Sequence, residues 1–274
     1  MKTAVVTIAA RREHHLRQHL RSVGQMTERV GDHVVVAIGD RKTTEVVSEA
    51  GGARSVWCDH DGGPLPLAAA RNLGADAALA AGADLIVFLD VDCLAGPALL
   101  RRYRVAADHP RNHSALLCGP VTYLPPPGPG GYDLDRLAEL RNPHPARPAP
   151  EDGTVLTGTD FTLFWSLSFA VSRETWHRIG GFCTEYRGYG GEDTDFACSA
   201  AEAGIGLRWV GGADAFHQHH PVSDPPVEHL GDILVNAHLF HRRWGWWPMR
   251  GWLEAFEALG LIDYDAAQLR WVPR

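Results

Sequence analysis

The sequence predicts an α/β protein built on a doubly wound, mostly parallel sheet. In the first ninety residues, aliphatic and β-branched runs alternate with segments whose apolar residues recur at helical spacing. The run 85–89 is continuously apolar, which is typical of a central parallel strand buried on both faces. In such sheets the crossovers are right-handed and ligands bind beyond the carboxyl ends of the strands. We therefore look for a site just after residue 89.

The alternation can be followed in order along the first half of the chain. After residue 119 the sequence becomes rich in Pro and Gly, which indicates loops. A hydrophobic pattern typical of helices and strands returns at 160–210. Each loop is either a plain surface connection or a flap that closes over a ligand. The expected strands cover 3–8, 33–38, 55–57 and 85–89; the expected helices cover 16–23, 43 onward and 66–81; the loops at 125–131 and 142–153 flank a helical pattern at 134–140.

The composition limits the number of domains and the classes of partner that the protein can have. The 274 residues are 45% hydrophobic and 22% charged, enough for one large domain. We expect two closely packed halves, 1–120 and 121–274, within a single domain. A net charge of -7 argues against a nucleic-acid partner.

The same composition gives expectations about location. The apolar start is broken by charged residues at 11–13, and no run is long enough to span a membrane, so we expect no anchor. Five scattered cysteines without a C-x-x-C pair indicate reduced thiols. We therefore expect a cytoplasmic protein.

The first chemical feature is the Asp90-Val91-Asp92 triplet after the apolar run 85–89. Unpaired carboxylates are costly near a core, so a cation is their natural partner. Mg²⁺ and Mn²⁺ prefer carboxylate oxygens, and added histidine shifts the preference toward Mn²⁺. The alternative is a helix cap with a solvated turn before Pro97.

Two further features follow in the second half. Gly190, Gly191, Glu192 and Asp193 precede a helical stretch that runs to about residue 203. The glycines allow close backbone approach to a ligand, and the carboxylates either accept a proton or merely cap the helix. A histidine cluster at 217–220 is either a metal site or a solvated loop.

Taken together, these features resemble the glycosyltransferase family 2 group of the GT-A fold, with a galactosyltransferase-like C-terminal module. The resemblance spans most of residues 3–220. The segments that carry it are Asn72-Leu73-Gly74, Leu89 to Asp92, Ser168 to Arg173, Gly180-Gly181-Phe182, Gly188 to Asp193, and His217.

The resemblance implies a metal and a nucleotide-sugar donor, with residues 1–120 as the nucleotide-sugar-binding half and 121–274 as the acceptor-binding and catalytic half. Asp92 and His217 would ligate Mn²⁺ or Mg²⁺, with His219 as the fallback ligand, and Asp90 would approach the ribose. Arg71 matches a basic residue that faces the diphosphate, although it could equally lie on a helix surface.

The nucleotide would lie against the ends of the first two strands. By the resemblance, the residues that cradle it are Thr7, Ala9, Arg11, Asp40 and Val91. The chain reads Ala37-Ile38-Gly39-Asp40 where family members often carry an acidic pair, so the resemblance is looser at the base. Uridine is the expected nucleoside.

On the acceptor side, the resemblance makes Asp193 the general base of an inverting, single displacement. Gly190, Gly191 and Glu192 would face the sugar or acceptor, and Tyr189 would be an acceptor platform. Trp165 lies near the expected acceptor groove or is a core aromatic. The expected reaction moves a hexose or N-acetylhexosamine from a UDP-sugar to a small-molecule or carrier-linked acceptor.

Two other classes remain open from the sequence: a sugar-phosphate nucleotidyltransferase and a non-catalytic glycan-binding module. The tail adds a further question, because five of the nine tryptophans lie at 244–271. They either pack on the fold, wall the acceptor, or form a homodimer face.

Overall fold

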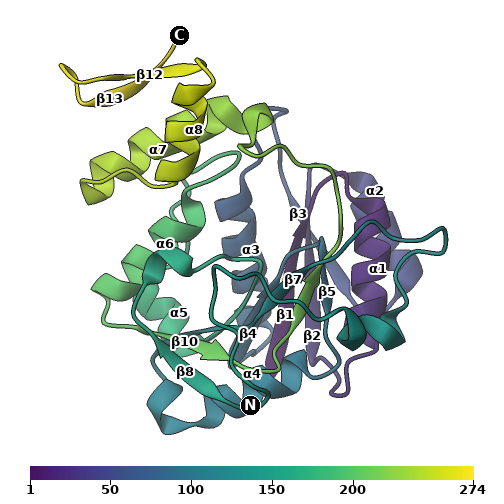
Figure 1. The fold of residues 1–274 in the computed structure, drawn as a ribbon. Helices are drawn as coiled ribbons and strands as arrows, with labels where there is room; N and C mark the ends of the chain where they lie inside the picture. The colour runs from purple at the N-terminus through teal and green to yellow at the C-terminus, as the bar shows by residue number, and fades with distance from the viewer.

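The computed structural model describes all 274 residues and has a central eight-stranded sheet. Its strands are β1 (Thr3–Ala9), β2 (Asp32–Ile38), β3 (Arg54–Cys58), β4 (Leu85–Leu89), β6 (Ala115–Cys118), β8 (Val155–Gly158), β9 (Ser168–Ser172) and β10 (Gly206–Val210). Their order is β3-β2-β1-β4-β9-β6-β10-β8 (Figure 1). The predicted strands and helices of the first ninety residues are thus confirmed.

The sheet is mixed at its centre. β4 is parallel to β1, as expected, but antiparallel to β9 on its other side. Residues 85–89 thus form the expected central strand buried on both faces, and β9 is an antiparallel strand within the mostly parallel sheet. The cause is the route of the chain: Asp90 N donates to Leu167 O (3.0 Å), so β9 enters the sheet beside the carboxyl end of β4 and runs back.

Helices cover both faces because successive strand residues point to opposite sides. Val6 and Phe88 pack against one helical layer, whereas Val5 and Leu85 pack in the core on the other face. The first layer contains α3 (Leu67–Ala80), α5 (Arg173–Ile179) and α6 (Glu192–Glu202); the second contains α1 (Glu13–Gly24), α2 (Arg41–Ala50) and α4 (Leu99–Asp108).

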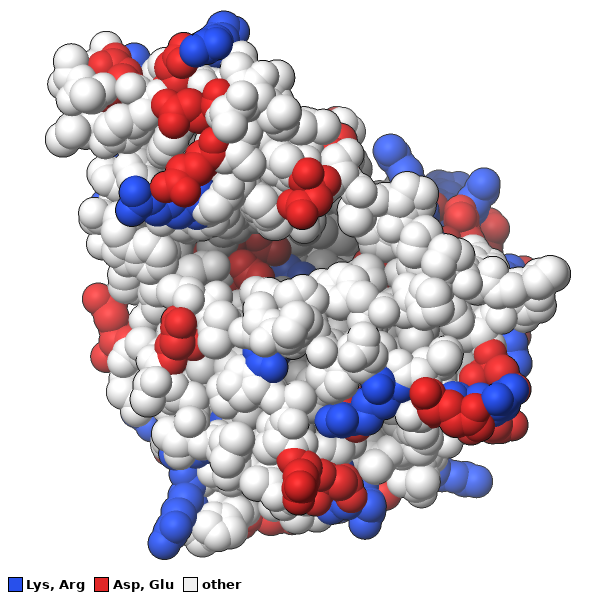
Figure 2. All heavy atoms as spheres, in the orientation of Figure 1, with Lys and Arg blue, Asp and Glu red and all other residues white.

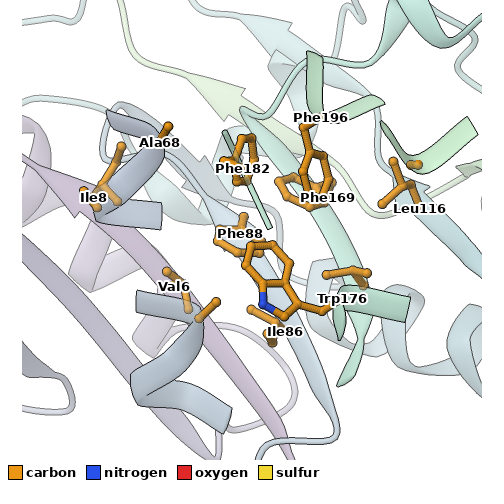
Figure 3. Packing of buried hydrophobic residues seen from close by; sticks show 14 of the residues in the cluster. Val6, Ile8, Ala68, Ile86, Phe88, Leu116, Phe169, Trp176, Phe182 and Phe196 are labelled. Carbon is orange, nitrogen blue, oxygen red and sulfur yellow. The ribbon is translucent and has the colours of Figure 1, made fainter. Parts of the chain in front are cut away.

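The larger core is aromatic at its centre (Figure 3). Phe88 stacks on Phe169 with ring centroids 4.6 Å apart, and Phe182 stacks on Phe196 at 4.2 Å. Each such side chain contributes roughly 1.5–3 kcal/mol by burial. Phe182 follows the Gly180-Gly181 pair and Phe196 lies on α6, so this packing fixes the segment that precedes and begins α6.

A second, three-stranded sheet lies at the carboxyl end of β4. It consists of β5 (Cys93–Ala95), β11 (Ala215–His217) and β7 (Val121–Tyr123), in the order β5-β11-β7. The pattern at 134–140 forms a 3-10 helix, η2 (Leu134–Leu140).

The 142–153 loop is fixed by Arg147, which is 5% exposed. Its guanidinium carbon lies 5.0 Å from the ring centroids of both Trp165 and Trp209. Such cation–π contacts stabilise a buried cation. Arg147 therefore holds the loop against the sheet.

The C-terminal region forms its own small core. It comprises α7 (Leu230–Trp244), α8 (Arg250–Ala258) and the hairpin of β12 (Ile262–Asp265) and β13 (Arg270–Pro273). Figure 1 shows these elements together, away from the main sheet. Trp271 is buried in this core, Trp247 stacks on His241 at 4.2 Å, and Trp244 donates to Asp195. Most of the tryptophan cluster therefore packs on the fold.

All five cysteines are unpaired in the structure. None of the helices combines the length and the apolar character that crossing a lipid bilayer requires.

A buried polar chain links β1 to α1 and β2. His19 Nδ1 donates to Cys93 O (2.7 Å), so its Nε2 accepts from the Thr7 hydroxyl (2.9 Å), which in turn accepts from His33 Nε2 (3.2 Å). Burial lowers the pKa of His19 to about 4 and the pKa of His33 well below its ordinary value.

We predict acid-sensitive stability from this chain. Both histidines are neutral when folded, so the unfolded chain binds more protons below the ordinary histidine pKa of 6.5. Their contribution is complete above that pKa and is lost as the pH falls toward about 4. Between about pH 7.5 and pH 5, urea unfolding should show a loss of roughly 1–4 kcal/mol.

Replacing both histidines by glutamine should flatten this dependence, whereas the exposed His177→Gln control should keep it. An unchanged slope in the double variant would assign the acid sensitivity to other groups.

Candidate active site

The small sheet brings together residues that are far apart in sequence. His217 ends β11 and pairs with Cys93 of β5 on one side and Tyr123 of β7 on the other. Gln218 N donates to Asp92 O (2.7 Å), which continues the pairing by one residue. Asp92 and His217 therefore face the same space because strand register places them there.

Three side chains at this point are arranged as metal ligands. One ligand atom each from Asp92, His217 and His220 lies within 4.8 Å of the others. His217 Nε2 is 3.5 Å and His220 Nε2 is 3.6 Å from the same Asp92 carboxylate oxygen. His219, the expected fallback ligand, is outside this group and exposed; its neighbour His220 takes the place. β11 ends at His217, so strand alternation no longer sets the directions of His219 and His220, which depend on the path of the chain beyond the strand.

Beside the metal group, Arg71 connects two acidic residues. Its Nη2 lies 3.2 Å from Asp90 Oδ2 and its Nη1 lies 3.2 Å from Glu192 Oε1. The Arg71 side chain is only 4% exposed, which rules out the helix-surface alternative. The two contacts span 19 and 121 residues of sequence and join α3 to the end of β4 and the start of α6.

The Gly-Gly-Glu-Asp segment is held by glycines and by α7. Gly191 caps α6 with φ +91°, a conformation that favours glycine. At Gly188, with φ +70°, a Cβ would lie 2.0 Å from the Asp232 carboxylate. Asn236 Nδ2 donates to Arg187 O (2.9 Å) and Tyr189 O (3.2 Å). This scaffold fixes the position of Glu192 and Asp193 at the first turn of α6.

The carboxyl groups of the cleft have different proton affinities. Burial, with the nearby Glu192 charge, raises the pKa of Asp193 to about 7 against the opposing effect of the Thr194 amide. Burial would also raise the pKa of Asp92, but hydrogen bonds from His217 and His220 outweigh it and hold that pKa well below its ordinary value. Burial and the Asp92 charge raise the pKa of Asp90 to about 6, although Arg71 opposes the shift.

Three residues expected to cradle the nucleotide have buried side chains. Thr7 is 1% exposed and its hydroxyl is engaged by His19 and His33, while Ala9 and Val91 pack in the core under α1 and α2. Thr7 and Ala9 lie on the sheet face that is turned toward α1. Their side chains are turned away from solvent, so only their backbone atoms could reach a ligand, and their part in nucleotide binding stays a prediction.

Arg11 and Asp40, unlike Thr7, Ala9 and Val91, are not buried. Asp40 Oδ2 accepts from Arg11 N (2.9 Å), and Asp40 Oδ1 accepts from Lys42 N (3.1 Å) at the start of α2. Although burial opposes the shift, these bonds lower the pKa of Asp40. Asp40 thus caps α2 and fixes the exposed Arg11 at the end of β1.

Aromatic side chains line two sides of the cleft. Tyr189, 39% exposed, stacks on His229 (4.5 Å) and Trp252 (5.9 Å). On the other side, Tyr123 stacks on His217 (4.6 Å), and His144 contacts both Tyr123 (5.5 Å) and Trp165 (5.0 Å). Figure 2 shows a hollow below the C-terminal helices, with acidic and basic atoms on its floor.

Some of these residues were not singled out from the sequence. Tyr123 reaches the site by strand pairing and Asn236 by the packing of α7. Neither contact can be predicted from a local sequence motif. The sequence did contain a signal for His220, because three histidines occur in four positions, and the path of the chain after β11 decides which of them join Asp92.

Comparisons with known proteins agree with this arrangement. Residues 159–221 match the family model described as the N-terminal domain of galactosyltransferase. GalNAc-T7 with UDP, GalNAc and Mn²⁺ is 15% identical with a TM-score of 0.55, and the match covers 80% of this chain and 44% of that one. S. aureus TarS 1–349 in complex with UDP is 12% identical with a TM-score of 0.57, and the match covers 95% of this chain and 78% of that one. The protein has the GT-A fold.

This confirms the fold class and the galactosyltransferase-like segment inferred from the motifs. The matched segment contains β9, α5, α6, β10 and β11, and thus the 188–193 loop and all three histidines of the cluster. The chain spans less than half the length of GalNAc-T7. Curated proteins give no significant match to the sequence.

The geometry predicts which histidine matters for metal binding. His220→Ala should weaken Mn²⁺ binding in the presence of UDP by about tenfold or more, because it removes one of three ligand atoms. His219→Ala, one residue away and outside the group, is the matched control and should leave affinity unchanged. Calorimetric titration with Mn²⁺ measures both. Equal weakening by the two substitutions would contradict the assignment of His220.

Proposed function

We propose that the protein is a metal-dependent, inverting glycosyltransferase. It moves a hexose or N-acetylhexosamine from a UDP-sugar to a hydroxyl group of a small-molecule or carrier-linked acceptor. The observation that carries the proposal is one cleft with a carboxyl group of raised pKa, Asp193, and a separate carboxylate and histidine group, Asp92, His217 and His220. The UDP in the GalNAc-T7 and TarS structures supports the choice of donor.

The residues present suit a divalent metal. One carboxylate and two imidazoles favour Mn²⁺ over Mg²⁺, because Mg²⁺ prefers oxygen ligands. The Mn²⁺ in the GalNAc-T7 structure supports the same choice. Asp92, His217 and His220 would hold the ion. A bound metal would neutralise negative charge on the donor diphosphate and the leaving nucleotide.

Arg71 has a different role from the one implied by the resemblance. Since its guanidinium is buried between Asp90 and Glu192, we assign it to positioning these carboxylates rather than to direct diphosphate binding. Asp90 keeps a partly exposed carboxylate, with its side chain 20% accessible, that can accept from a ribose hydroxyl. Arg11 and Asp40 flank the nucleotide end of the cleft.

Asp193 supplies the base. A carboxyl group with a pKa near 7 is matched to proton transfer at neutral pH, since it is partly ionised and still basic enough to take a proton. Asp193 would accept the proton of the acceptor hydroxyl as that oxygen attacks C1 of the donor sugar. The bond from C1 to the diphosphate oxygen breaks, UDP leaves, and the configuration at C1 inverts.

The acceptor would bind between the two aromatic sides of the cleft. Tyr189 is exposed beside the 190–193 segment, and Trp165 contacts His144 on the opposite side. Apolar ring faces of a sugar stack well on such side chains. The unpaired cysteines support a reducing compartment such as the cytoplasm for this reaction.

Release of UDP from a panel of UDP-sugars with added Mn²⁺ tests the proposal. Asp193→Asn should lower kcat by about 10²–10⁴ while UDP affinity stays unchanged, because the amide keeps the shape and loses the base. Asp76→Asn, an exposed aspartate on α3, is the matched control and should keep full activity. Near-normal turnover by Asp193→Asn would exclude Asp193 as the base, and absence of UDP release by the unaltered protein would favour a binding module.

The pH dependence gives an independent check. A base must be deprotonated to act, so kcat/KM should rise with pH and level off above about 7, the pKa of Asp193. The residual activity of Asp193→Asn should lack this rise. The measurement is kcat/KM against pH, over the pH range in which the protein stays folded. If Asp193→Asn showed the same rise, the titrating group would be a residue other than Asp193.

A further inference from the structure

A second pocket lies on the α4 face of the sheet, away from the active-site cleft. It has a volume of about 380 Å³ and lies between α4, the short 3-10 helix η1 (Pro110–Asn112), the edge strand β8 and its neighbour β10. None of its lining residues belongs to the cleft. Pockets for small molecules in proteins have volumes of about 300–1,000 Å³, so this one is large enough for a compact ligand.

The sequence builds the pocket from two regular faces. Arg102, Val105 and Ala106 lie on one face of α4, since residues three and four apart share a helix side. Opposite them, Arg208 pairs with Thr157 and Val210 with Val155 across β10 and β8, and alternate residues of a strand share a sheet face.

Arg208 is fixed in place with its charge unpaired. Its Nε donates to Asn112 Oδ1 (3.1 Å), its Nη1 to Leu207 O (2.9 Å) and its Nη2 to Arg111 O (3.3 Å). Each terminal nitrogen keeps one further N–H, because a guanidinium carries five. No carboxylate lies within 4.0 Å of Arg208 or of its neighbour Arg111.

Arg102 adds a third cation. Its guanidinium pairs with Asp152, but its Nε is buried and has no hydrogen-bond partner. Three arginines thus share the pocket with a single paired carboxylate. In a protein of net charge -7, such a local excess of positive charge is unexpected on the basis of composition.

We propose that this pocket binds a small organic phosphate. Guanidinium groups match phosphate oxygens in charge and in the spacing of their donors. The walls formed by Val105, Val155 and Val210 offer apolar contact to the carbon part of an ester. The size of the pocket favours a compact monoester over a polymer.

Calorimetry with phenyl phosphate, inorganic phosphate and phenol tests the proposal, using the whole protein saturated with UDP and Mn²⁺. Phenyl phosphate should bind more tightly than inorganic phosphate, and phenol should not bind. Arg208→Gln and Arg111→Gln should each weaken binding by about tenfold or more, the usual cost of a lost charged hydrogen bond. Arg111 is exposed, so its variant tests the pocket without disturbing the core.

Arg101→Gln is the matched control, because Arg101 is exposed on α4 and lies outside the pocket. It removes the same charge and should leave binding unchanged. Equal weakening by all three substitutions would show diffuse attraction and overturn the proposal, as would absence of binding or equal affinity for phenyl phosphate and inorganic phosphate. Because the readout is binding outside the cleft, failure here leaves the proposed transferase activity untouched.

Discussion

The arrangement of the cleft depends on the buried guanidinium of Arg71. Four carboxyl groups, those of Asp90, Asp92, Glu192 and Asp193, gather in one cleft, and their mutual repulsion must be offset. Arg71 contacts two of them from inside the protein. A buried ion pair gains little net stability after desolvation, so its more direct consequence is geometric. It ties the end of β4 to the start of α6 and fixes the spacing between the two halves of the cleft.

This constraint leaves two carboxyl groups in contrasting surroundings. Asp92 is held ionised by His217 and His220, whereas Asp193 has only backbone and distant charges to offset its burial. When two nearby carboxyl groups have different environments, their pKa values separate, and each group can then take a different chemical role. The same cleft can therefore offer an anion to a metal and a base to an acceptor.

Much of the fold could be predicted from the sequence because its signals are local. The apolar run 85–89 and the glycine-led start of α6 at Gly191 carry their own patterns. The antiparallel entry of β9 could not be predicted, since it depends on the path of a distant segment. Within the site, the roles of Asp92 and His217 came from the family resemblance, but choosing His220 over His219 required the path of the chain after β11 ends at His217. Likewise, the Thr7 side chain points toward α1 because of strand alternation and the position of that helix. This direction could not be predicted from a sequence motif.

The central claim is that Asp193 drives a single displacement at the donor sugar. Proton NMR can follow the anomeric configuration of the sugar released when the protein slowly hydrolyses a UDP-α-sugar in the presence of Mn²⁺. The account predicts that the first product is the β-anomer, before mutarotation mixes the two forms. An initial α-anomer would contradict it.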